Sequence, residues 1–111
     1  MKAIRIIAIL VGLGTIAWQM SELAAGRADN MFFLPDIIVS LFLAGSALIR
    51  PERRAQVLML CGFGLMSGIY SVATLGQLWL GALEAGGIST AVGLAFTLPS
   101  MAWLAARLGR D

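Results

Sequence analysis

The sequence contains no histidine and only one cysteine, and these shortages exclude several kinds of chemistry. Histidine is the commonest metal ligand and the usual general base near neutral pH. Cys61 lies in an apolar run and has no second cysteine with which to form an internal disulfide, so we expect it to pack as a small hydrophobic residue. We therefore expect no metal site, no cofactor and no enzymatic activity.

Charged residues are also scarce: they make up 13% of the 111 residues, against about 25% in soluble domains. The net charge of +2 is too small and too scattered for nucleic-acid binding. Apolar residues reach 59%, with a mean hydropathy of +0.90. A soluble chain of this length buries only about two-thirds of its surface and could not hide so many apolar side chains. The composition predicts a membrane protein whose main partner is the lipid bilayer.

Four apolar stretches have roughly the length that a membrane-spanning helix needs, about 20 residues. They cover approximately residues 4–23, 31–49, 57–80 and 88–108. The connections between them are short, so consecutive helices must be antiparallel neighbours. The predicted fold is an all-α membrane protein with a single domain, residues 1–111, whose four transmembrane helices form an up-down-up-down bundle.

The basic residues are distributed unequally between the two sides of this predicted bundle. Only Arg27 lies on one side, and the other seven of the eight lie on the opposite side: Lys2, Arg5, Arg50, Arg53, Arg54, Arg107 and Arg110. Cytoplasmic flanks of membrane helices carry the excess of Lys and Arg. We therefore expect a multi-pass protein of the cell inner (cytoplasmic) membrane with both termini in the cytoplasm.

The first stretch also has features of a secretory signal peptide, because two basic residues precede an apolar core. Removing it would leave three helices and would place the two remaining basic clusters on opposite sides of the membrane. We therefore expect this stretch to be retained as the first helix.

Small and polar residues recur at helical spacing in each stretch and predict the faces that point into the bundle. The glycines that we expect at close contacts between helices are Gly12, Gly64, Gly68 and Gly93. Gly64 and Gly68 form a GxxxG pair, which suits packing within the bundle or, as the alternative, a homodimer through the third helix. Pro99 interrupts the hydrogen bonding of the fourth helix and predicts a kink that would serve as a hinge.

The second stretch raises the question of how deeply Asp36 lies in the membrane. Residues 37–49 would extend only about 20 Å as a helix, which is shorter than the apolar layer of about 30 Å. A full span must therefore begin near residue 31, which would submerge Asp36 by about 8 Å. An ionisable group at that depth is a functional hypothesis. Together with Gln19, Glu22 and Gln77 at the same level, Asp36 predicts a small polar pocket that opens to the outside and binds an ion.

The same acidic residues also have a structural interpretation, which the sequence alone favours. Pro35 and Asp36 are typical of the first turn of a helix, where a carboxylate interacts well with the helix dipole. Glu22 can pair with Arg27 at the surface, and Glu84 falls in a connection where it would be solvated. In this interpretation none of the acidic residues needs a function.

In length and number of helices the chain resembles the small multidrug resistance transporters. That family has an essential glutamate in the middle of its first helix, where this sequence has Gly12, Gly14 and Thr15. The motif is not matched, so membership in the family is not inferred.

Three functions fit these observations. The first is an accessory or assembly subunit that packs against the helices of a partner membrane protein, because the chain has small-residue faces and no soluble domain. The alternative is a homo-oligomeric small transporter or channel for a proton, small cation or solute, in which Asp36 and Glu22 would bind the ion. The third is a non-catalytic binder of a lipid or quinone, for which Phe63, Met66 and Tyr70 would be suitable contacts.

Overall fold

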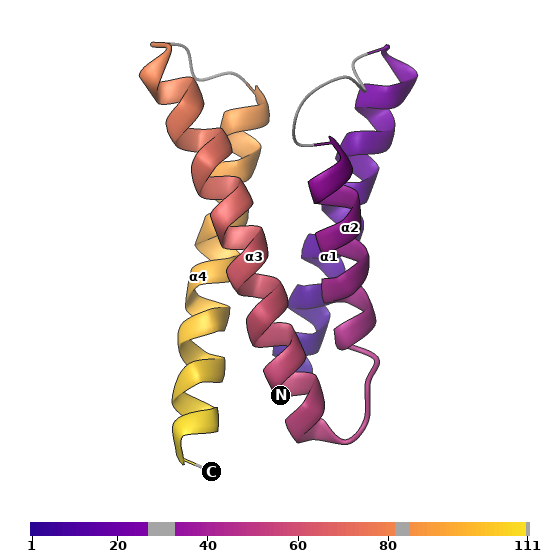
Figure 1. Ribbon diagram of the computed structural model, residues 1–111, viewed down its shortest axis with the longest axis vertical. Coiled ribbons are helices and arrows are strands. Elements are labelled where there is room, and N and C mark those ends of the chain that lie inside the picture. The colour runs from indigo at the N-terminus through magenta and orange to yellow at the C-terminus, as the bar shows by residue number, and fades with distance from the viewer. Residues whose placement is uncertain (27–32, 82–84, 111) are drawn as a thin grey trace.

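The structure is a computed structural model that describes residues 1–26, 33–81 and 85–110. In these residues the chain forms four α-helices (Figure 1): α1 (Lys2–Ala24), α2 (Phe33–Ser46), α3 (Glu52–Trp79) and α4 (Ala85–Arg110). The prediction of an all-α chain with four helices is confirmed. Three of them, α1, α3 and α4, contain stretches long and apolar enough to cross a membrane.

The predicted helix boundaries differ from the structure by one to five residues, and Pro51 explains the largest difference, at the start of the third helix. Proline has no N–H group and restricts the residue before it, so a helix tends to stop ahead of it and a new one can begin after it. The second helix ends at Ser46 rather than at residue 49, and its 14 residues extend about 21 Å. The third helix begins at Glu52 rather than at residue 57, with Pro51 as its N-terminal cap.

Arg5 stabilises the early end of α2 by binding the backbone that follows it. The Arg5 guanidinium donates hydrogen bonds from Nη1 to the carbonyl oxygens of Ala47, at 2.6 Å, and Ile49, at 3.0 Å. Carbonyl groups at the end of a helix have no partner within the helix, so a cationic donor from α1 satisfies them. This contact fastens α1 to α2.

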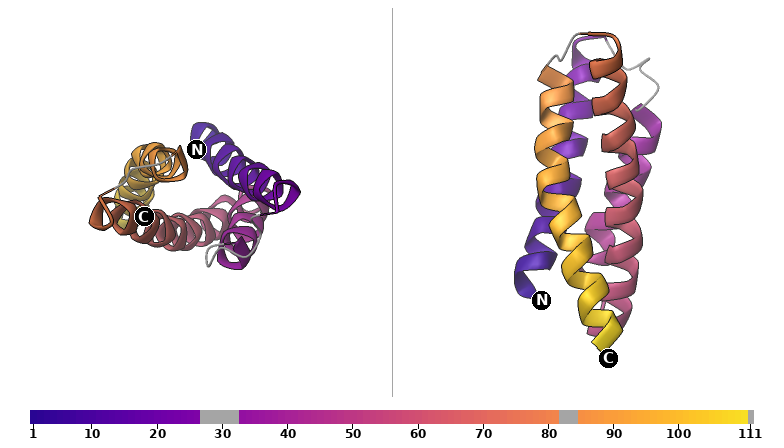
Figure 2. Two further views of the ribbon diagram at one scale, coloured as in Figure 1. Left: turned by 90° about the horizontal axis from the view of Figure 1, so that it is seen from above. Right: turned by 90° about the vertical axis from the view of Figure 1, so that its left-hand side faces the viewer.

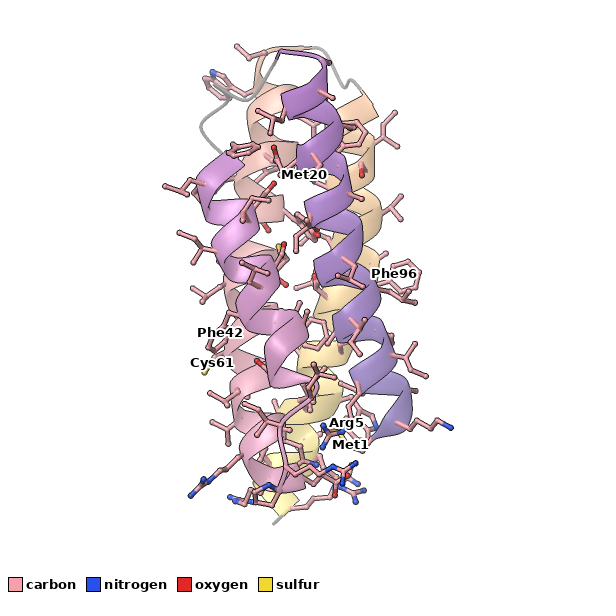
Figure 3. The ribbon with its side chains drawn as sticks, turned by 90° about the vertical axis from the view of Figure 1, so that its right-hand side faces the viewer. Met1, Arg5, Met20, Phe42, Cys61 and Phe96 are labelled. Atoms are coloured by element: carbon pink, nitrogen blue, oxygen red, sulfur yellow. The ribbon has the colours of Figure 1, made fainter. Side chains whose placement is uncertain are left out.

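The helices pack as two pairs, α1 with α2 and α3 with α4, and α2 also packs against α3 (Figures 1 and 2). Contact between α1 and α4 is the least extensive of these pairings. Both termini and the α2–α3 connection lie at the same end of the molecule (Figure 1), and nitrogen-bearing side chains gather there (Figure 3). We call this the basic end; its residues are Lys2, Arg5, Arg50, Arg53, Arg54, Arg107 and Arg110.

The apolar core occupies the half of the bundle nearer the basic end. Its buried side chains come from all four helices and from the turn after α2: Ile4, Ala8, Leu43, Ala47, Ala55, Met59, Phe63 and Leu104. Many other large apolar side chains are exposed on the outside of the bundle, with Trp79 at 91% the most extreme. Such a surface is unfavourable in water and suits a lipid environment, consistent with a membrane protein.

Close packing of α1 on α2 depends on Gly12. A Cβ atom at this position would lie 2.8 Å from the carbonyl oxygen of Ser40 and 3.1 Å from Cβ of Ala44. At Gly64, by contrast, the nearest atom to an added Cβ is Cε of Met101 at 3.8 Å, and at Gly68 nothing lies within 4 Å. The face of α3 that carries Gly68 is therefore open.

Pro99 lies inside α4, which continues through it as one helix. Its side chain is exposed, on the outer side of the bundle. The hydroxyl of the next residue, Ser100, bonds to the carbonyl oxygen of Phe96 at 2.7 Å. Side-chain bonds of this kind supply backbone carbonyls near a helix interruption with a donor.

We expect Gly12→Leu to destabilise the protein by about 1–3 kcal/mol, because the new side chain would force the α1 and α2 backbones apart. Gly14→Leu is the matched control on the same helix, since the space around Gly14 is open. Reversible denaturant unfolding in detergent micelles measures both. Equal losses of stability in the two variants would contradict the close packing of α1 on α2.

Candidate functional site

Asp36 is a buried carboxylate in the first turn of α2, with only 6% of its surface exposed. Its Oδ2 atom accepts a hydrogen bond of 2.5 Å from Nε2 of Gln19 on α1. Its Oδ1 atom is also buried and has no hydrogen-bond partner among the described residues. The carboxylate is therefore only half satisfied in the interior of the bundle.

Of the four residues predicted to form a polar pocket, the structure joins Gln19 directly to Asp36. Glu22 and Gln77 are half-buried, and each interacts with other groups. Asp36 lies in the first turn of α2, as the structural interpretation predicted, but its side chain is buried and faces α1. Arg27 and Glu84 lie outside the described residues.

Ser40 continues the polar face of α2 one helical turn after Asp36. Its side chain is fully buried, and its Oγ atom has no hydrogen-bond partner among the described residues. Residues four apart on a helix project from the same face. The two unpartnered oxygen atoms, Asp36 Oδ1 and Ser40 Oγ, thus belong to one surface of α2.

Tyr70 connects α3 to both α1 and α4 at this level of the bundle. Its hydroxyl group is hydrogen-bonded to Oγ1 of Thr15 on α1. The Thr15 hydroxyl donates its proton to the carbonyl oxygen of Val11 at 2.8 Å, so the Tyr70 hydroxyl must be the donor toward Thr15. The Tyr70 ring lies against Gly93 on α4, where any Cβ atom would overlap it.

These residues form what we call the polar cluster: Thr15, Gln19, Asp36, Ser40 and Tyr70. The cluster draws on α1, α2 and α3 and is buried or half-buried throughout. The polar cluster lies in the half of the bundle away from the basic end, whereas the apolar core lies in the half nearer that end.

Hydroxyl pairs also join α3 to α4. Ser67 donates to Oγ1 of Thr97 at 2.8 Å, and the hydroxyls of Thr74 and Thr90 lie 2.6 Å apart. Hydrogen bonds of this kind are a usual means of association between helices in an apolar environment. They hold α3 and α4 together as a pair.

The sequence pointed to only part of the polar cluster. Ser40 and Thr15 stand four residues from Asp36 and Gln19, and this spacing was the available signal for them. No spacing pattern relates Tyr70 to Gly93 or to Thr15, because these contacts depend on how the helices rotate against one another. Phe63 and Met66, proposed as contacts for a lipid or quinone, are fully buried within the bundle.

The chain matches no protein-family model, no curated protein and no solved structure. In the described part of the chain, no three Cys, Asp or Glu residues form a group that could hold a metal ion. The meaning of the site must therefore come from its own geometry.

We expect the Thr15–Tyr70 hydrogen bond to appear as a coupling of about 0.5–1.5 kcal/mol in a double-mutant cycle. The cycle combines Thr15→Val with Tyr70→Phe and measures unfolding free energies in micelles. Thr15→Val combined with Thr74→Val is the control, and their effects should add within about 0.5 kcal/mol because Thr74 pairs with Thr90. Additivity in the first cycle as well would contradict the bridge between α1 and α3.

Proposed function

We propose that this chain is a small membrane transporter or channel that works as a homo-oligomer and carries a proton or another small cation through Asp36. The observation that supports this is the buried, half-satisfied carboxylate: Oδ2 is bonded to Gln19, whereas Oδ1 has no partner among the described residues. Intramembrane carboxylates of this kind mark ion pathways and proton relays.

The energy of a buried charge explains why a mobile cation is needed. An ionised carboxylate loses its hydration inside an apolar bundle, and one neutral hydrogen bond does not replace it. The basic side chains that the structure describes lie at the opposite end, and Arg5 is already engaged by the backbone after α2. A proton or a small cation would cancel the charge and could leave again.

The proposed setting is the cell inner membrane, with the basic end in the cytoplasm. The charge distribution supports this orientation, since cytoplasmic flanks carry the excess of Lys and Arg. Asp36 and Gln19 would then lie in the outer half of the bundle, and the apolar core, which includes Leu43, Met59 and Phe63, in the inner half. A cation would reach Asp36 from outside, and the apolar core would close the inner half to water.

We expect the helices to move relative to each other where the contact between them is limited. Contact between α1 and α4 is limited, whereas each pair of helices is firmly joined. Separation of the two pairs, with bending of α4 at Pro99, would open the inner half. A homo-oligomer is proposed because four helices rarely enclose a complete pathway.

Proteoliposomes test this proposal. With an imposed membrane potential and a proton or sodium gradient, the unaltered chain should support cation uptake, and Asp36→Asn should reduce uptake to the level of protein-free vesicles. Glu52→Gln is the matched control, because Glu52 is an exposed carboxylate at the basic end. Uptake that persists in Asp36→Asn, or that is absent from the unaltered chain, would contradict the proposed function.

An accessory subunit is the second candidate, and the open face of α3 supports it. Nothing lies within 4 Å of an added Cβ at Gly68, and the neighbouring side chains of Cys61, Leu65 and Val72 are exposed. Figure 3 shows Cys61 directed outward from the bundle. A helix of another chain could approach closely along this face.

For this candidate we expect Gly68→Ile to lower the yield of a co-purified complex several-fold, with the chain itself still folded. Gly14→Ile is the control, since Gly14 also faces open space but lies on α1. Oxidative cross-linking through Cys61 reports whether the partner is a second copy. A complex that survives Gly68→Ile unchanged would contradict association through this face.

A further inference from the structure

The hydroxyl of Ser40 departs from the behaviour of other inward-facing hydroxyls in this bundle. Inside an apolar helix a serine or threonine usually donates to the carbonyl oxygen four residues earlier. Ser46 does so toward Phe42 at 2.6 Å, and Ser100 and Thr15 make the equivalent bonds. Ser40, although fully buried, makes no such bond and has no other partner among the described residues.

The position of Ser40 is fixed by the packing of α1 on α2. Its carbonyl oxygen lies against Gly12, where an added Cβ atom would come within 2.8 Å of it. On the same face, one turn earlier, Asp36 is held by Gln19 through Oδ2. Two oxygen atoms that can both accept or coordinate, Asp36 Oδ1 and Ser40 Oγ, are thereby held on one rigid surface.

The two atoms are not hydrogen-bonded to each other. A proton on Asp36 Oδ1 would cancel the charge, but it would leave both the new O–H donor and Ser40 Oγ buried without partners, which costs free energy. A metal cation coordinates several oxygen atoms at once and would satisfy both. A single carboxylate balances a single positive charge, and oxygen donors suit hard cations.

We propose that the polar cluster binds a monovalent metal cation of about the size of sodium, with Asp36 Oδ1 and Ser40 Oγ among its ligands. Gln19 is a positioning residue, because it holds the other carboxylate oxygen and so directs Oδ1 toward the ion. This inference rests on the proposed function and names the cation that Asp36 carries. Because only a metal cation would bind Ser40 Oγ as well as Asp36, a substitution at Ser40 distinguishes binding of a metal cation from binding of a proton.

The test measures whether sodium stabilises the chain in detergent, and thermal unfolding is the method of measurement. Sodium chloride replaces choline chloride at constant ionic strength, so that screening is unchanged. A ligand that binds only the folded state raises the unfolding temperature with its concentration. We expect sodium to raise it for the unaltered chain, potassium to do so less, and Asp36→Asn to abolish the effect.

Ser40→Ala is the decisive variant, and Ser46→Ala is its control on the same helix, because Ser46 is equally buried but its hydroxyl already bonds to Phe42. Ser40→Ala should raise the sodium concentration at half-maximal stabilisation about tenfold or more, as loss of a partner in a metal site does. Ser46→Ala should leave that concentration unchanged.

Three outcomes would overturn the inference. Equal sodium dependence in Ser40→Ala and the unaltered chain would show that Ser40 does not coordinate the ion and that water satisfies its hydroxyl. Asp36-dependent proton uptake without any sodium effect would show that the site binds a proton; the proposed function would then stand and this inference would fail. Absence of both Asp36-dependent uptake and sodium stabilisation would remove the proposed function as well.

Discussion

The hydrogen bond between Gln19 and Asp36 is the interaction on which the polar cluster depends. It ties the buried carboxylate of α2 to α1 and leaves the second oxygen of that carboxylate without a partner in the described structure. A carboxylate in an apolar interior is costly unless its charge is cancelled. The proposal of cation binding rests on the second carboxylate oxygen, which has no partner, because an Asp36 with both oxygens hydrogen-bonded would have only a structural role.

The hydrogen bond between Gln19 and Asp36 lies in the half of the bundle away from the basic end, and the two halves differ in how their helices pack. Near the basic end the core consists mainly of apolar side chains such as Leu43, Phe63 and Leu104, although Gln56 is also buried there. In the other half, Tyr70 takes over the role of joining the helices: its ring lies against Gly93 on α4 and its hydroxyl group bonds to Thr15 on α1. Hydrophobic burial thus dominates the packing near the basic end, and side-chain hydrogen bonds contribute more to the contacts between helices in the other half.

The sequence was sufficient for the class of fold but not for the contacts within it. Apolar runs and short connections predicted four helices, and the structure has four, but only α1, α3 and α4 are long and apolar enough to cross a membrane, whereas α2 has 14 residues. The predicted start of the third helix was wrong, because the charged residues after Pro51 do not form a connection but extend α3 toward the basic end. Helical spacing placed Gln19 and Asp36 at one level. It carried no information on how α3 and α4 rotate against each other, and therefore none on the contact between Tyr70 and Gly93.

The proposed cation site lies within the α1–α2 pair, whereas the proposed movement takes place between the two helix pairs. The contact of Gly12 with the backbone of Ser40, the bond from Gln19 to Asp36 and the bonds from Arg5 all lie within the α1–α2 pair. A site built within one rigid pair keeps its geometry when the pairs shift relative to each other. Because contact between α1 and α4 is limited, a shift of the two pairs meets little resistance there. The hydrogen bond between Tyr70 and Thr15 joins the two pairs, so the same shift would strain it. Access to the proposed cation site could thus change while the contacts around Asp36 do not, which is the property that the proposed carrier requires.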